Sequence, residues 1–272
     1  MAVSESWAPV LLGAGVGALV GASAILWPVG PLVRENYAGR PVPVMLGFAL
    51  VAGTAFGFLV GRPGAERPAV EVVAVASLGG LFLAGLADDA AAGGPRGLAG
   101  HLRSLSRGRP TTGILKLAVG VAAGVAAALA AGGPPVRLVA GAVLVAASVN
   151  LLNALDLRPG RALKWGLLVL VATLPTLWGT GTGALVGAGT GAALGVLPYD
   201  LRERGMLGDA GSNPLGFLAG LGLLLVLSTP LLVVAAVIAV GLQVVAETVT
   251  FSSVIGATPP LAWFDRLGRR SG

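Results

Sequence analysis

The sequence contains no cysteine, a single histidine and only 11% charged residues. Without cysteine, the chain has neither disulfide bonds nor thiolate metal sites. Soluble globular domains carry about a quarter charged residues, so the low charge and the 55% of hydrophobic residues exclude that class. We therefore predict a polytopic membrane protein. The chain also lacks a module that combines aromatic and basic residues, so no nucleic acid is expected as a partner.

Nine apolar windows are long enough to cross a hydrocarbon core of about 30 Å. They lie near residues 8–28, 43–61, 69–87, 114–132, 136–153, 164–180, 182–198, 214–228 and 230–248. Gly- and Pro-rich turns separate them. Small residues at spacing four, such as Gly183, Gly187 and Gly191, predict close helix packing. The expected fold is one all-α domain over residues 1–272, a membrane bundle of about nine helices.

Lysine and arginine are distributed unequally between the two sides of this arrangement. Only Arg62, Arg67 and Arg137 lie on one side, and the other 15 of the 18 basic residues lie on the opposite side. Basic residues favour cytoplasmic loops, so we expect the N-terminus outside and the C-terminus in the cytoplasm. The predicted cytoplasmic segments are then residues 29–42, 88–113, 154–163, 199–213 and 249–272.

Acidic and amide residues are grouped at helix ends, all on this cytoplasmic side. The three groups are Asp88 with Asp89, Asn150 with Asn153 and Asp156, and Asp209 with Ser212. A carboxylate at the edge of hydrocarbon is costly, so three groups on one side predict one shared site for metal and phosphate chemistry.

Each group also has a purely structural alternative. The aspartate pair could end a helix in solvent, and the two asparagines could join neighbouring helices by hydrogen bonds. Ser212 or Asn213 is expected to cap the eighth window, with Pro214 in its first turn. Free N–H groups at such a helix start suit an anion, and Asp209 could hold a cation beside it.

Four segments resemble, in order and helix position, the motifs of the polyprenyl-phosphate N-acetylhexosamine-1-phosphate transferases, the superfamily that includes the phospho-N-acetylmuramoyl-pentapeptide translocase. The segments are Gly85-x2-Asp88-Asp89, Leu115-Lys116-Leu117, Asn150-x2-Asn153-x2-Asp156 and Leu207-Gly208-Asp209-Ala210-Gly211-Ser212. The resemblance covers nearly the whole chain. It implies helices packed around a cytoplasmic cleft in the plasma membrane.

The resemblance implies transfer of a sugar 1-phosphate from a UDP-N-acetylamino sugar to polyprenyl phosphate, with release of UMP, for cell-envelope glycan synthesis. It implies Mg2+ as cofactor, with Mn2+ as a substitute, and Asp209 as its ligand. Asp88 or Asp89 would act as base on the lipid phosphate, and Lys116 would contact phosphate. Pairing of two copies stays open.

By the same resemblance, Asn150, Asn153 and Asp156 would hold the nucleotide-sugar diphosphate and organise the metal. Ser212 belongs to the substrate-binding set. Asp200 lies nine residues before Asp209, close to where the family often has a nucleotide-contacting asparagine.

The chain departs from the family pattern in three places, of which the mildest is Leu207 where the family usually has methionine. The family's central motif continues as Asp-Gly-x-Asp-Gly, but Pro159 stands where the second aspartate would be. Arg158 and Arg161 in that loop become candidates for contact with the donor. The family's His-rich loop is missing, and in its place Leu261, Phe264 and Leu267 predict a short interfacial helix.

These departures motivate an alternative function. A non-catalytic membrane protein on the same scaffold would bind a lipid-linked precursor or a cell-envelope partner. A transporter is the weaker rival, because the acids lie at helix ends and not at the midplane, where coupling sites usually occur.

Overall fold

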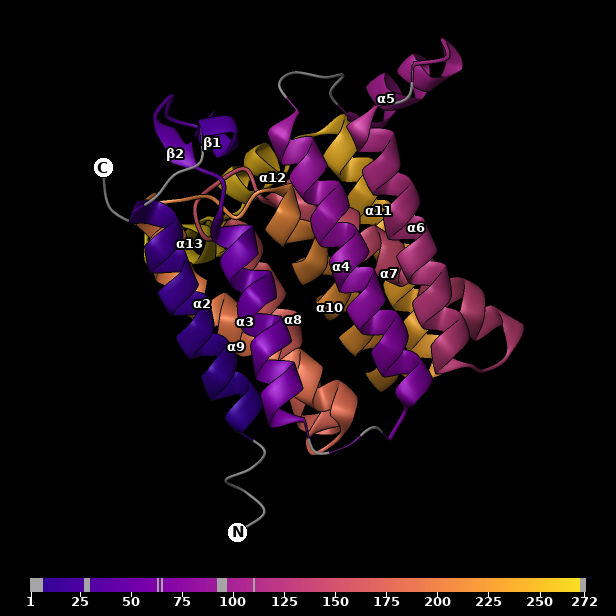
Figure 1. The fold of residues 1–272 in the computed structure, drawn as a ribbon. Helices are drawn as coiled ribbons and strands as arrows, with labels where there is room; N and C mark the ends of the chain where they lie inside the picture. Colours follow the sequence, from indigo (N-terminus) through magenta and orange to yellow (C-terminus); the bar gives the residue numbers. More distant parts are fainter. Residues whose placement is uncertain are drawn as a thin grey trace.

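The computed structural model describes residues 7–26, 30–62, 64, 66–91, 97–109 and 111–269. Most of this part is helical (Figure 1). The helices are α2 (Ala8–Leu26), α3 (Leu46–Gly61), α4 (Pro68–Ala90), α5 (Gly97–Ser106), α6 (Thr112–Ala131), α7 (Pro135–Leu155), α8 (Arg161–Leu177), α9 (Gly181–Leu201), α10 (Asp209–Val226), α11 (Thr229–Thr248), α12 (Phe251–Ala257) and α13 (Pro259–Arg266). A 3-10 turn, η1 (Gly30–Leu32), precedes an antiparallel hairpin of β1 (Val33–Glu35) and β2 (Pro41–Pro43).

Seven of the described helices are long and apolar enough to cross a membrane, namely α2, α4, α6, α7, α9, α10 and α11. Two further bundle helices, α3 and α8, have 16 and 17 residues. Large apolar side chains such as Leu11, Leu129 and Val237 are exposed on the outside. Helices that are apolar all round are typical of membrane spans. The fold is therefore an all-α bundle of the multi-pass membrane class.

The bundle helices pack in two groups. Helices α2, α3 and α9 form one group, and α4, α6, α7, α10 and α11 form the other, with α8 against both α9 and α10. The two groups stand side by side in Figure 1. The predicted packing role of the α9 glycines is confirmed, because a Cβ on Gly191 would overlap the carbonyl oxygen of Val10 in α2. Helix α10 is the most buried of the seven, with 78% of its apolar window inside the bundle.

Helix α10 begins earlier than the sequence predicted. It starts at Asp209 with Gly208 as the N-cap residue. The prediction that Ser212 or Asn213 caps this helix was wrong, since both lie inside it and are buried. A carboxylate from α4 receives the first N–H groups of α10, so a local side-chain cap is not needed.

Candidate functional site

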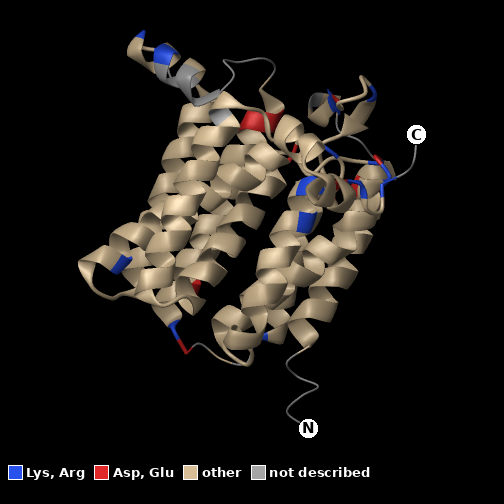
Figure 2. Ribbon diagram, turned by 180° about the vertical axis from the view of Figure 1, so that it is seen from behind, with Lys and Arg blue, Asp and Glu red and all other residues tan. Residues whose placement is uncertain are grey.

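Charged residues gather toward one end of the bundle. Figure 2 shows most of the aspartate, glutamate, lysine and arginine near the end that carries the hairpin. Helices α4, α6 and α10 place Asp88, Asp89, Lys116 and Asp209 there, and α7 contributes Asn153. We call these five residues the Lys116 cluster.

Lys116 lies at the centre of the cluster. Its Nζ donates a hydrogen bond to Asp88 Oδ2 at 3.1 Å and another to Asp209 Oδ2. Thr112, one turn earlier on α6, donates its hydroxyl to Oδ1 of Asp88. The side chains of Lys116, Asp88 and Asp209 are 16%, 24% and 21% exposed. These ionic contacts are therefore partly shielded from salt and water, yet they remain open to a small ligand.

Asp89 forms different hydrogen bonds from its neighbour Asp88. Its two carboxylate oxygens accept the backbone N–H groups of Asp209 at 3.0 Å and Ala210 at 2.9 Å. These are free donors in the first turn of α10, where a negative charge is favoured. The Asp89 carboxylate thus caps α10 from α4 and fixes the backbone that carries Asp209.

Asn153 connects α7 to the same turn of α10. Its Nδ2 donates to Asp209 Oδ1 and, at 3.1 Å, to the Ser212 hydroxyl. Asp209 therefore has one oxygen on Asn153 and the other on Lys116, which leaves its carboxylate little rotational freedom. Asn150, one turn earlier on α7, takes no part in the described hydrogen bonds of the cluster.

Asp156 lies directly after α7 and is partly buried. Burial raises the pKa of its carboxyl well above the usual range, and the negative charges of Asp200 and Asp209 raise it further. The backbone N–H of Gly208 acts in the opposite direction. Asp156 thus lies between the Lys116 cluster and a neighbouring pocket.

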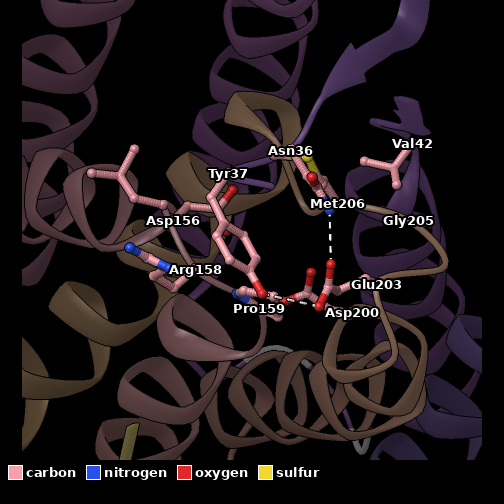
Figure 3. A pocket seen from close by; sticks show the side chains of 11 residues that line it. Asn36, Tyr37, Val42, Asp156, Arg158, Pro159, Asp200, Glu203, Gly205 and Met206 are labelled. Atoms are coloured by element: carbon pink, nitrogen blue, oxygen red, sulfur yellow. Dashed lines mark hydrogen bonds between the residues drawn. The ribbon is translucent and has the colours of Figure 1, made fainter. Parts of the chain in front are cut away.

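That pocket is shown in Figure 3; it is a narrow cavity of about 20 Å³ that opens to solvent. Asp156, Arg158 and Asp200 line it, together with Tyr37 of the hairpin and Glu203. The guanidinium of Arg158 lies 4.4 Å from the centre of the Tyr37 ring. The Tyr37 hydroxyl and the Asn36 amide donate to Glu203 at 3.1 and 2.8 Å (Figure 3). A flat aromatic surface and several acceptors thus face one cavity beside the cluster.

Arg161 lies in a separate ionic network and not in the pocket. It forms a two-pronged pair with Asp265 of α13, at 2.8 and 3.0 Å, and its side chain is 3% exposed. Lys164 donates to three carbonyl oxygens at the end of α13. Arg269 joins Asp265 to the Pro159 carbonyl. This network fastens the C-terminal segment to the loop between α7 and α8.

The positive charges of this network lower the pKa of Asp265. Burial would raise the pKa of Asp265, but the hydrogen bond and charge of Arg161, with the charge of Arg269, hold that pKa below its usual range. Arg270, which belongs to the predicted cytoplasmic segment 249–272, lies outside the described residues. The short helix expected around Leu261 and Phe264 is present as α13.

Several site residues were not predicted from the sequence. Thr112 could have been found, because it precedes Lys116 by four residues and so shares its helix face. Arg34, whose guanidinium donates to the carbonyls of Asp89 and Ala91, had no such signal. Asn213 is 1% exposed and its amide hydrogen-bonds to no described residue. It lies one turn after Asp209 on the same face of α10.

The oxygen donors of the cluster fit a magnesium ion. Among the described residues, no three His, Cys, Asp or Glu side chains form a ready metal cage. Mg2+ does not require one, because it keeps several waters and is commonly held by one or two carboxylates plus substrate phosphates. Asp88 and Asp209 supply two carboxylates that already converge on a single cation, the Lys116 ammonium.

An apolar groove runs from the membrane region toward the cluster. It has a volume of about 430 Å³ between α7, α8, α10, α11 and α12, and its lining includes Leu152 and Leu155 of α7. These leucines are within one helical turn of Asn153 and Asp156. The groove is thus lined almost wholly by apolar side chains, and it reaches the charged end of the bundle.

No protein family model matches this chain, and no curated protein matches its sequence. The assignment of function therefore depends on the geometry of the site and on the motif resemblance.

Proposed function

We propose that the protein transfers a sugar 1-phosphate from a UDP-N-acetylamino sugar to polyprenyl phosphate and releases UMP. The observation that carries this proposal is the meeting of Asp88, Lys116, Asn153 and Asp209, from four helices, at the charged end of an apolar bundle. An oxygen of the lipid phosphate forms a bond to the sugar-bearing phosphorus. The pyrophosphate bond breaks, and UMP leaves.

In this proposal α3 and α8 cross the membrane together with the seven longer helices, which gives nine spans. The packing of α3 against α2 and α9, and of α8 against α9 and α10, supports this count. The excess of basic residues on the side of the cluster supports a cytoplasmic site in the plasma membrane. The N-terminus would then be outside and the C-terminus inside.

The two aspartates at the end of α4 have separate roles. Asp89 is a positioning residue, because both its oxygens are engaged by the N–H groups of α10. Asp88 faces Lys116 and Thr112 and is the better placed of the two to act at the lipid phosphate, as a ligand of Mg2+. The apolar groove beside Leu152 would hold the first units of the lipid chain.

Positive charge is required wherever two phosphates approach each other. Lys116 supplies one such charge at the centre of the cluster. Asp209 and Asp88 would hold Mg2+, which neutralises phosphate oxygens when it is bound. Asn153 orients Asp209 and lies where a diphosphate would contact it, whereas Ser212 is fully buried and would act through its hydrogen bond with Asn153.

The outer rim of the pocket of Figure 3, where Tyr37 is half exposed, would contact the nucleotide part of the donor. A base would stack on the face of the Tyr37 ring that Arg158 does not cover, and Asp156 would accept an N–H group or hydroxyl of the donor. Asp200 is buried and accepts the Gly160 N–H, so it would shape the floor of this site. Arg158 lies on that ring, where it can also meet a phosphate. Arg161 would support this pocket indirectly, through the C-terminal network.

The experiment is an assay of UMP release by the purified full-length protein. It combines a panel of UDP-N-acetylamino sugars with a polyprenyl phosphate and Mg2+, and each component is omitted in turn. We expect release only when donor, lipid and metal are all present. A non-catalytic scaffold would bind the lipid but release no UMP from any donor, and that result would reject the enzymatic proposal.

A further inference from the structure

The Lys116 ammonium lies between two carboxylates that would also serve a divalent ion. It contacts Oδ2 of Asp88 at 3.1 Å and Oδ2 of Asp209. Magnesium holds its oxygen ligands at about 2.0–2.1 Å, so an ion bound to both oxygens would overlap the space that the ammonium fills. The two cations therefore exclude each other.

We propose that Lys116 occupies the cation position of the metal-free site, and that a divalent ion enters only when the ammonium leaves it. The identity of the ion rests on the proposed function. The exchange itself rests on the contacts of the cluster. One cation replaces another, so the two carboxylates never face each other without a positive charge between them.

The hydrogen bonds around the two aspartates and the lysine indicate which side chain moves when the ion enters. Asp209 is held by Asn153 through its second oxygen, and its backbone N–H is fixed on Asp89. Asp88 is held by the Thr112 hydroxyl. Lysine has a flexible four-carbon stem and three rotatable donors, so the Lys116 side chain is the member of the cluster that can turn away.

The exchange links metal loading to phosphate binding. A displaced Lys116 ammonium stays beside the site, because its backbone is anchored in α6. Its charge is then free for an anion. Loading of the ion thus makes the lysine available to a phosphate at the step where a phosphate arrives.

The first test measures Mn2+ affinity, with Mn2+ as a paramagnetic probe for Mg2+, by electron paramagnetic resonance on the full-length protein. We expect Lys116→Met to bind Mn2+ about tenfold more tightly than the wild type, which corresponds to about 1.4 kcal/mol. Arg34→Met is the matched control. It removes a positive charge at the same cluster, but the described contacts of Arg34 there are to backbone carbonyls.

If only the loss of a positive charge matters, both variants should gain the same Mn2+ affinity. If Lys116 and the metal exchange, Lys116→Met should gain much more Mn2+ affinity than Arg34→Met. Equal gains, or no Mn2+ binding by any of the three proteins, would overturn the proposal. Asp209→Asn should abolish the binding and so locate it.

The second test uses the wild type and does not depend on the folding of a variant. The sequence has two lysines, Lys116 and Lys164, so methylation of each amine with formaldehyde and cyanoborohydride can be followed by peptide mass spectrometry. Saturating Mg2+ should increase the labelling of Lys116. Lys164, held by three carbonyl oxygens, is the internal control and should not change. Unchanged or reduced labelling of Lys116 while metal binds would overturn the exchange.

The two proposals fail separately. If Mn2+ affinity and lysine labelling change as predicted but no UMP is released, the cation exchange is supported and the enzymatic proposal is rejected. If UMP release depends on metal but Lys116→Met does not bind Mn2+ more tightly than the wild type, the enzymatic proposal is supported and the cation exchange is rejected.

Discussion

Gly85 of α4 lies against the backbone carbonyl of Asp209, at the start of α10. A Cβ at position 85 would overlap that oxygen, so only glycine lets the two backbones come this close. The contact lies one turn before Asp88 and Asp89 on the same helix. It thus sets the distance across which Asp89 caps α10 and across which Lys116 bridges Asp88 and Asp209.

Replacing Gly85 with alanine should separate these helix ends. We expect a loss of about 1–3 kcal/mol of stability, the usual effect of overpacking, and a larger loss of activity, because the cap and the cluster depend on the same contact. Gly79→Ala on the same helix is the control, since nothing lies within 4 Å of its Cβ position. Apparent melting temperature in detergent and UMP release measure both effects. Equal behaviour of the two variants would contradict this account of α4.

Substitutions of the two aspartates of α4 should have different effects: one should lower stability and the other turnover. Asp89→Ala removes both acceptors of the α10 cap and should lower stability by about 0.5–2 kcal/mol, as the loss of an N-cap does. Asp88→Asn should keep the fold and lower turnover by about 100-fold or more, because it weakens a metal site that would supply several kcal/mol of transition-state stabilisation. Melting curves and kcat decide between them. A turnover defect confined to Asp89→Ala would reverse the assignment.

The pair of Arg161 and Asp265 should be structural. Asp265→Ala leaves a buried guanidinium without its main partner and should lower stability by about 3–5 kcal/mol. The pKa of Asp265 is held below its usual range, so the pair stabilises the fold above the unfolded-state pKa and is lost as the pH falls through the folded value. Arg266→Gln, on the exposed side of the same helix, should change little. Melting curves from neutral to acidic pH test this, and an Asp265→Ala protein as stable as Arg266→Gln would reject it.

The contribution of Asp156 to folding stability should depend on pH in the opposite direction from that of Asp265. Its folded pKa is raised, so the unfolded chain ionises first, and folding stability decreases as the pH rises from about 4, where a free aspartate titrates, toward the folded value. Asp156→Asn should therefore raise the melting temperature at neutral pH, by about 2–4 °C for each kcal/mol recovered, and lower activity. A melting temperature that falls would show that the charged form stabilises the fold.

The positions of the main helices could be predicted from hydropathy. Each of the nine windows coincides with a helix of the bundle to within a few residues, except at the start of α10. There the prediction failed by five residues, because the cap comes from Asp89, more than a hundred residues away in the chain. The hairpin of β1 and β2 was also missed, since its short strands carry no apolar pattern.

The site could be predicted in part. Sidedness placed Asp88, Asn153 and Asp209 at one end of the bundle, and the structure brings these three into one hydrogen-bonded cluster around Lys116. The sequence could not show that Arg161 turns away to Asp265, because that contact depends on the path of the C-terminal segment. The chemical roles of these residues stay predictions.

The most direct test of the central claim compares UMP release by the wild type and by Asp209→Asn in the same lipid vesicles. Donor and Mg2+ are supplied on the side of the membrane that carries the Lys116 cluster. We predict Mg2+-dependent release by the wild type and its loss in a folded Asp209→Asn protein. Equal release by the two proteins, or none by a folded wild type with any UDP-sugar, would contradict the account.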